Sequence, residues 1–158
     1  MSDIIRIWIE TTHNPAFRSG GWAYVLAEGR ALLGAAGGER TASPERVALA
    51  GLVEALKAAP ARVTVEVRSA SPLVVAAPQR MAAREPPTED LELWVQLGTA
   101  LKDRSVSFAR TASAPKTPPA FAAAWADLAR DKVKSGGAFR AAIPKINLGK
   151  AGVPDAPG

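Results

Sequence analysis

The chain has 158 residues, of which 47% are hydrophobic and 22% are charged. This composition is typical of a single globular domain that can bury a hydrophobic core. The absence of cysteine excludes disulfides and thiolate chemistry, and a single histidine excludes a zinc site built from several imidazoles. No apolar run is long enough to cross a membrane and the N-terminus lacks a basic flank, so we expect a cytoplasmic protein without membrane contact.

The net charge of +5 is distributed unevenly along the chain. Residues 1–103 contain 11 Lys and Arg against 12 Asp and Glu, whereas residues 104–158 contain 9 against 3. The excess positive charge therefore lies in the last third, which favours an anionic partner such as nucleic acid. The alternative is a basic surface that only keeps the protein in solution, because charge by itself says little about partners.

The first part of the chain predicts three strands and a helix. Alternating β-branched residues and turns that contain Gly or Pro predict strands over residues 4–10, 22–27 and 30–36. Ser43 then provides a helix cap and Pro44 a first helical residue. Apolar residues follow at the spacing of one helix face, so we expect the first helix here.

The remainder of the chain alternates helices and strands. We expect, in order, a strand over 62–68, a short helix over 71–77, a loop over 78–88, a helix over 89–101, a strand over 105–109, a loop over 111–119 and a helix over 120–133. Three consecutive strands followed by strands with helical crossovers predict an α/β fold. Its sheet is mixed and five-stranded, with helices on both faces.

The C-terminal segment differs in composition from the rest. Residues 136–158 contain three prolines and five glycines, which predicts a flexible tail after a domain of residues 1–135. Its apolar residues are spaced apart, at Phe139, Ile143, Ile146 and Leu148. A tail needs no such residues for solubility, so this segment is a candidate for docking on a protein partner.

Six short segments follow one another in the order and near the spacing of a known family. They are Ile5–Glu10, Asn14-Pro15 with Gly20–Ala23, Thr41–Leu56, Val67–Ser71, Leu91–Trp94 and Trp125–Arg130. Together they resemble the ribonuclease H family over residues 4–133. The resemblance implies a ribonuclease H-like fold. For an active member it also implies cleavage of the RNA strand of an RNA–DNA hybrid, with two magnesium ions held by four carboxylates.

This chain keeps one acid at the four positions that resemble the family's carboxylates. Glu10 matches the first, and alanines match the other three, at Ala48, Ala70 and Ala126. The family's loop histidine has no counterpart in residues 111–119, and His13 lies in a different predicted loop. One carboxylate does not fix two metal ions. The resemblance therefore implies that hydrolysis is absent or vestigial, with no metal cofactor unless residual activity uses Mg²⁺.

We therefore expect a pseudo-nuclease that binds RNA–DNA hybrid or a related nucleic acid without cutting it. Six cations near the fifth strand and the end of the last helix are candidate phosphate contacts: Arg104, Arg110, Lys116, Arg130, Lys132 and Lys134. Two alternatives remain open. One is a protein-interaction module on the same fold, and the other is a weak metal-dependent ribonuclease H that uses Glu10 and Glu45.

Overall fold

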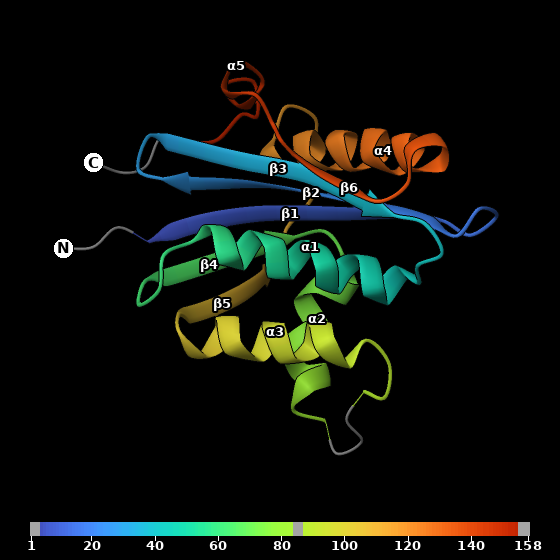
Figure 1. The fold of residues 1–158 in the computed structure, drawn as a ribbon. Helices are drawn as coiled ribbons and strands as arrows, with labels where there is room; N and C mark the ends of the chain where they lie inside the picture. The colour runs from blue at the N-terminus through green and yellow to red at the C-terminus, as the bar shows by residue number, and fades with distance from the viewer. Residues whose placement is uncertain (1–3, 84–86, 155–158) are drawn as a thin grey trace.

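The computed structural model describes residues 4–83 and 87–154, and its strands form one mixed sheet (Figure 1). The strands are, in chain order, β1 (Ile5–Asn14), β2 (Ser19–Glu28), β3 (Ala31–Glu39), β4 (Thr64–Ser69), β5 (Ser105–Arg110) and β6 (Phe139–Ala142). Their order across the sheet is β5-β4-β1-β2-β3-β6. The strands β1, β4 and β5 are parallel, whereas β2, β3 and β6 join by antiparallel pairing.

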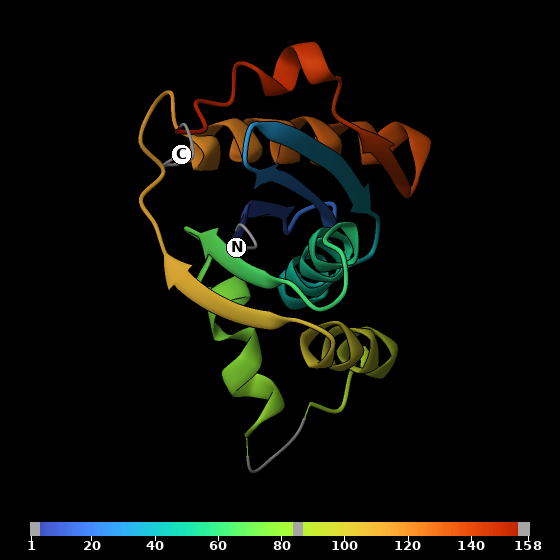
Figure 2. The same cartoon turned by 90° about the vertical axis from the view of Figure 1, so that its left-hand side faces the viewer.

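Helices cover both faces of the sheet (Figures 1 and 2). They are α1 (Pro44–Ala58), α2 (Pro72–Met81), α3 (Leu91–Lys102), α4 (Pro118–Gly136) and the short α5 (Lys145–Leu148). Helix α1 packs on one face together with α2 and α3, and α4 crosses the other face over β1, β2 and β3. The predicted α/β class is thereby confirmed. None of the helices in the described residues is long and apolar enough to cross a membrane.

The alternation of side chains along β1 produces two hydrophobic cores. Ile5, Ile7 and Ile9 pack into the larger cluster under α1, whereas Trp8 belongs to the cluster under α4. Helix α1 begins as predicted, because the Ser43 hydroxyl accepts a hydrogen bond from the Arg46 backbone N–H at 3.1 Å. β1 is therefore a central strand that is buried on both faces, and it holds Glu10 and the residues after it in place.

Several elements extend beyond their predicted ends. The first hairpin continues to Asn14 and returns from Ser19, so residues predicted as loop are paired strand. Helix α2 continues through Pro78 to Met81, although a proline inside a helix removes one backbone donor and crowds the preceding turn. Part of the predicted loop over 78–88 is therefore helical, and its residues 84–86 lie outside the described residues. Both extensions depend on packing partners that local periodicity does not report.

The C-terminal segment differs most from its prediction. In place of a flexible tail beside a five-stranded sheet, residues 139–142 form a sixth strand on the edge of β3. Ile143 and Leu148 are buried, and the Ile143 N–H donates to the Gly34 carbonyl at 2.9 Å. A Cβ on Gly34 would collide with Leu148, so the glycine makes room for this segment. The apolar residues that suggested a protein partner mostly pack on this chain, and residues 155–158 lie outside the described ones.

Candidate functional site

The parallel strands β1, β4 and β5 bring predicted site residues to one edge of the sheet. Ligands of α/β sheets commonly bind at such carboxyl ends. The Ala70 backbone N–H donates to Glu10 Oε2 at 2.8 Å, which joins the loop after β4 to β1. The Thr111 N–H donates to the Ser69 carbonyl at 3.0 Å, which places the end of β5 beside it. Glu10, Ala70 and Arg110 therefore come together from three parts of the chain.

The Glu10 side chain is buried in a place that disfavours its charge. Only 5% of the residue's surface is exposed. Burial raises the pKa of its carboxyl from 4.5 to about 7, while hydrogen bonds from the Ala70 N–H and the Ser69 side chain and the charge of Arg110 act in the opposite direction. The carboxyl is about half protonated near pH 7. A metal ion would have to displace that proton, so Glu10 alone is a weak ligand.

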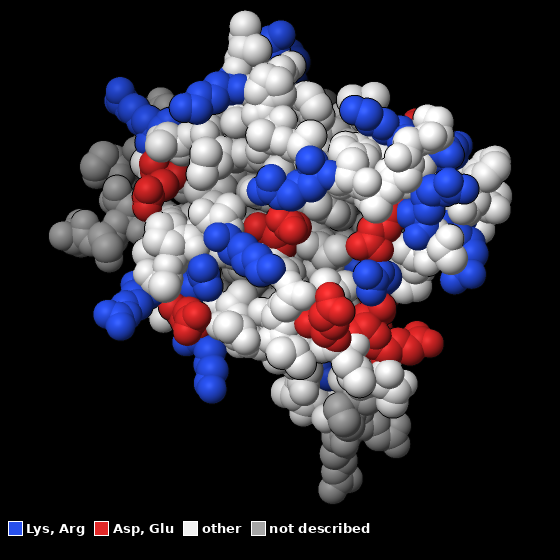
Figure 3. All heavy atoms as spheres, in the orientation of Figure 1, with Lys and Arg blue, Asp and Glu red and all other residues white. Residues whose placement is uncertain are grey.

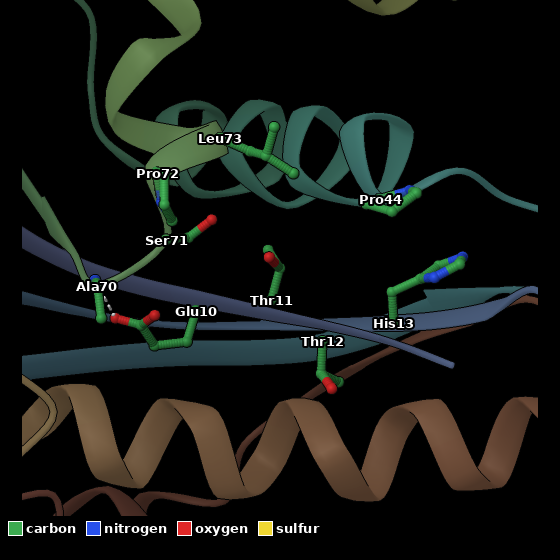
Figure 4. Close-up of a pocket in the computed structure, with 9 residues that line it drawn as sticks. All are labelled: Glu10, Thr11, Thr12, His13, Pro44, Ala70, Ser71, Pro72 and Leu73. Atoms are coloured by element: carbon green, nitrogen blue, oxygen red, sulfur yellow. Dashed lines mark hydrogen bonds between the residues drawn. The ribbon is translucent and has the colours of Figure 1, made fainter. Parts of the chain in front are cut away.

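A pocket of about 310 Å³ opens beside Glu10 (Figure 4). Its lining comes from β1 and from the starts of α1 and α2: Glu10, Thr11, Thr12, His13, Pro44, Ala70, Ser71, Pro72 and Leu73. Figure 4 shows Thr11 and His13 pointing towards α1 and Thr12 pointing towards α4. His13 lies on the extended β1 rather than in the predicted loop, and its Nε2 is 2.6 Å from the Ala42 carbonyl oxygen. Glu10 is the one acid among the lining residues.

The other predicted positions do not complete a metal site. Ala48 and Ala126 are buried on opposite faces of the sheet, under α1 and under α4.

The acids next to these two positions are already paired. Glu45 pairs with Arg80, and Asp127 pairs with Arg130. Within residues 4–83 and 87–154, no three acids or histidines gather closely enough to hold a metal ion. The residues present therefore do not fit the two-metal site that the sequence resemblance implies.

The cations predicted around β5 lie at different places. Arg110 ends β5 at the edge that holds Glu10. Arg104 precedes β5 at the opposite edge, where it donates to the Ala59 carbonyl at 2.7 Å and to the Ala100 carbonyl at 3.2 Å. It thereby ties the ends of α1 and α3 to the start of β5. Lys116 is exposed in the loop between β5 and α4.

The cations of α4 point in two directions. Arg130 donates to Thr12 Oγ1 at 2.9 Å and so lies against β1. Lys134, one turn later, places its Nζ 4.5 Å from the centre of the Phe17 ring in the β1–β2 hairpin. Lys132 instead lies over an aromatic ring of β6, at 5.0 Å. Arg130 and Lys134 therefore follow β1 from the pocket towards its hairpin, and Lys132 does not.

Sequence analysis missed Thr12 and Phe17. Phe17 carries a usable signal, because it is an aromatic residue between Pro15 and Gly20 that belongs to no periodic apolar stripe. Such a residue in a predicted turn is expected to be exposed. Thr12 carries no signal of its own, because its contact depends on α4, which lies more than a hundred residues away in the sequence.

Comparisons with known proteins identify the fold. No family model and no curated protein sequence matches this chain. The structure is similar to LC9-RNase H1, a type 1 ribonuclease H with the type 2 active-site motif, at a TM-score of 0.64 and 17% identity over 89% of this chain and 79% of that one. It is similar to LC11-RNase H1, solved in complex with an RNA/DNA hybrid, at a TM-score of 0.64 and 19% identity over 83% of this chain and 99% of that one.

A third similar structure comes from Mycobacterium tuberculosis. It is an N-terminal ribonuclease H domain solved as a fusion with maltose-binding protein, with a TM-score of 0.62 and 22% identity. The match covers 84% of this chain and 97% of that one. The order of the strands, the placement of helices on both faces and these structural similarities lead to one conclusion: the chain has a ribonuclease H-like fold.

Proposed function

We propose that this protein binds nucleic acid, in the first place an RNA–DNA hybrid, at the edge formed by β1, β4 and β5, and that it does not cleave it. The observation that carries the proposal is the single buried carboxyl of Glu10, which stands beside the charge of Arg110. Two-metal hydrolysis needs several carboxylates that hold both ions against the reacting phosphate. The Arg110 guanidinium can pair with a phosphate, and the protonated form of the carboxyl can donate a hydrogen bond to it, but a single acid cannot hold the two metal ions.

The choice of ligand is supported by the fold and by the charges. LC11-RNase H1, which has a similar fold, was solved with an RNA/DNA hybrid. In this chain Arg110 lies beside Glu10, and a cation in such a position binds phosphates with a strong dependence on salt. Arg130 reaches the same pocket through Thr12, but it also pairs with Asp127 and Asp131. Recognition of this kind reads the shape of the backbone and the 2′-hydroxyls rather than the base sequence. Because the proposal uses no metal ligand, binding is expected to persist when magnesium is removed.

The experiment is a fluorescence-anisotropy titration of a labelled hybrid, in magnesium and in EDTA, at a low and a high salt concentration. The RNA strand is then examined on a denaturing gel. Binding that weakens with salt and leaves the RNA intact supports the proposal. Cleavage that depends on magnesium and is lost in Glu10→Ala would establish the weak nuclease instead. No binding at low salt would leave the protein-interaction module as the function to test.

A matched pair of arginine variants tests the location of the site. Arg110→Gln is expected to weaken hybrid binding by about tenfold at low salt, because a charged hydrogen-bond donor to phosphate is lost. Arg62→Gln removes the same charge from an exposed residue just before β4, at the opposite edge of the sheet. It is expected to change the affinity by less than about twofold. Equal losses in both variants would mean that only the total charge matters, and the proposed location would be wrong.

A further inference from the structure

The β1–β2 hairpin presents an exposed aromatic side chain among three cations. Phe17 exposes 64% of its surface, and Lys134 of α4 lies over its ring. Arg18 follows Phe17, and its carbonyl accepts a hydrogen bond from the Ala42 N–H at 2.9 Å, which brings Arg40 to the same end of the molecule. Figure 3 shows Lys and Arg side chains gathered at this end. We call Phe17, Arg18, Arg40 and Lys134 the hairpin patch.

The charges of the hairpin patch are not neutralised by nearby acids. In the part of the chain that the structure describes, the ion pairs involve other basic residues, and none includes Arg18, Arg40 or Lys134. Single exposed apolar residues are common on protein surfaces and need no explanation. Phe17 is different because one face of its ring is next to the Lys134 ammonium group, and two further cations, Arg18 and Arg40, lie at the same end of the molecule. This combination fits a ligand that is both aromatic and anionic.

The hairpin tip is held in a fixed shape. The Asn14 side chain accepts a hydrogen bond from the Ala16 N–H at 3.0 Å, which closes the turn. Arg18 adopts a positive φ of 52°, an uncommon conformation for a residue with a Cβ, and its carbonyl is anchored to Ala42. Phe17 and Arg18 therefore need little further ordering when a ligand binds.

Residues of β1 and α4 lie between the Glu10 pocket and the hairpin patch. Thr12 lies two residues after Glu10 on the same face of β1, and Arg130 donates to it. Lys134 lies one turn further along α4. From Glu10 to Asn14, β1 advances about 13 Å at about 3.3 Å per residue, a length that a few nucleotides of a strand can span. A nucleic-acid strand held at Glu10 that follows β1 would reach the hairpin patch.

We propose that the hairpin patch binds an unpaired, single-stranded extension of the nucleic acid held at the Glu10 pocket, an inference that rests on the proposed function. A base stacks on the face of the Phe17 ring that Lys134 leaves open, and the three cations contact the flanking phosphates. The extension is single-stranded because bases inside a duplex are already stacked on each other and cannot reach a side chain. Stacking on one ring tolerates any base, so the site has little sequence preference.

An anionic membrane surface is the other ligand that accepts an aromatic ring among cations. Two observations favour nucleic acid. Thr12 of the Glu10 pocket is bound by Arg130, which lies one turn before Lys134 of the hairpin patch on α4. One phenylalanine ring also provides far less apolar area than the amphipathic face with which a helix binds a membrane surface.

The test compares two labelled ligands, a blunt RNA–DNA hybrid and the same hybrid extended by several unpaired nucleotides. The readout is the ratio of their affinities, measured by anisotropy for the full chain and its variants. For the wild type we expect the extension to tighten binding by about fivefold or more. Phe17→Ala should bring the ratio close to one, and Lys134→Gln should reduce the salt slope for the extended ligand by about one.

Two control variants make the same chemical changes elsewhere. Ile146→Ala removes an apolar side chain of α5 that is 78% exposed, and Lys150→Gln removes an exposed cation just after it. Both are expected to keep the wild-type ratio. Thermal unfolding of Phe17→Ala should match the wild type, because the ring is exposed and lies outside both hydrophobic cores.

The outcomes distinguish a failure of this inference from a failure of the proposed function. If the wild type binds both hybrids with equal affinity, or if Phe17→Ala keeps the preference, the hairpin patch is not an extension site although the proposed function stands. If neither hybrid binds, both are wrong. If the ratio is one and the wild type, but not Phe17→Ala, sediments with phosphatidylserine vesicles, the patch is a membrane contact and the inference is wrong.

Discussion

Among the residues that the structure describes, Glu10 is the acid whose environment most disfavours the ionised form. It is 5% exposed within the central strand β1, just beyond the residues paired with β4, and burial raises the pKa of its carboxyl to about 7 despite the nearby charge of Arg110. In a site that held metal ions, the ions would offset this cost. Here the Ala70 N–H and Arg110 offset it in part, so the ionised form remains unfavourable. Glu10 therefore links protonation to stability.

The variant Glu10→Gln tests this link. The folded carboxyl, with a pKa of about 7, holds its proton more tightly than the unfolded one at 4.5, so wild-type stability falls as pH rises between these values. A neutral glutamine avoids the loss. We expect the variant to be more stable than the wild type by up to about 3 kcal/mol at pH 8, with the difference disappearing near pH 4.5. Urea unfolding at both pH values measures it.

The matched control for this prediction is Glu28→Gln. Glu28 is an exposed acid at the end of β2, so the change should alter the free energy of unfolding by less than about 0.5 kcal/mol at either pH. A Glu10→Gln effect that does not vary with pH would show that the substitution acts through packing. The protonation argument would then be wrong.

Among the elements, α4 lies unusually close to the sheet. A Cβ on Gly21 of β2 would collide with the Ala126 carbonyl oxygen and with the Arg130 backbone nitrogen. Ala126 itself is fully buried in this contact. A small residue at each of these positions allows the close approach that holds Arg130 against β1. Ala126, which the sequence resemblance compares with a family carboxylate, thus has a packing role in this chain.

The variant Gly21→Ala should push α4 away from β2. We expect a loss of about 2–3 kcal/mol in the free energy of unfolding, because the colliding atoms are backbone and cannot rotate away. Gly136→Ala is the control, since nothing lies within 4 Å of a Cβ built at the end of α4. It should be neutral or stabilising by up to about 1 kcal/mol. Equal stability of the two variants in urea unfolding would contradict the close packing.

In the whole molecule, the C-terminal segment completes the sheet and covers part of its α4 face. Strand β6 pairs with β3, and Leu148 of α5 lies over Gly34 of the same strand. Near the end of the described residues, the Pro154 carbonyl accepts a hydrogen bond from Arg6 Nη2 at 3.0 Å. The two ends of the described chain therefore meet beside β1. This segment is part of the folded unit that carries the site.

We expect opposite effects on stability when two apolar residues of this segment are replaced by alanine. Leu148→Ala should lower the free energy of unfolding by about 2–4 kcal/mol, because the side chain is 2% exposed and its removal leaves a cavity. Ile146→Ala, only two residues away, should change it by less than about 0.5 kcal/mol, because Ile146 is 78% exposed. Denaturant unfolding of both variants measures the difference. A small loss in Leu148→Ala would mean that the segment does not hold to the sheet in solution.

Features that depend on neighbours along the chain could be predicted from the amino-acid sequence. The alternation at Ile5, Ile7 and Ile9 predicts β1, and Ser43 with Pro44 predicts the start of α1. The order of these elements and the resemblance of six short segments predict the ribonuclease H-like fold, which the structure confirms. They also predict one acid, Glu10, at the end of the first strand, although β1 continues beyond it to Asn14.

The tertiary structure alone decided which residues meet across the chain. Gly- and Pro-rich composition predicts a flexible tail, but β6 finds partners on β3 because Gly34 leaves room for Leu148. The contacts of Arg104 with the carbonyls of Ala59 and Ala100 likewise appear only in the structure, and its role as a phosphate contact stays a prediction. Phe17 meets Lys134 only because α4 crosses the sheet. Such contacts join residues that are far apart in the sequence. They depend on how closely the helices and strands pack, and a local sequence pattern contains no information about that packing.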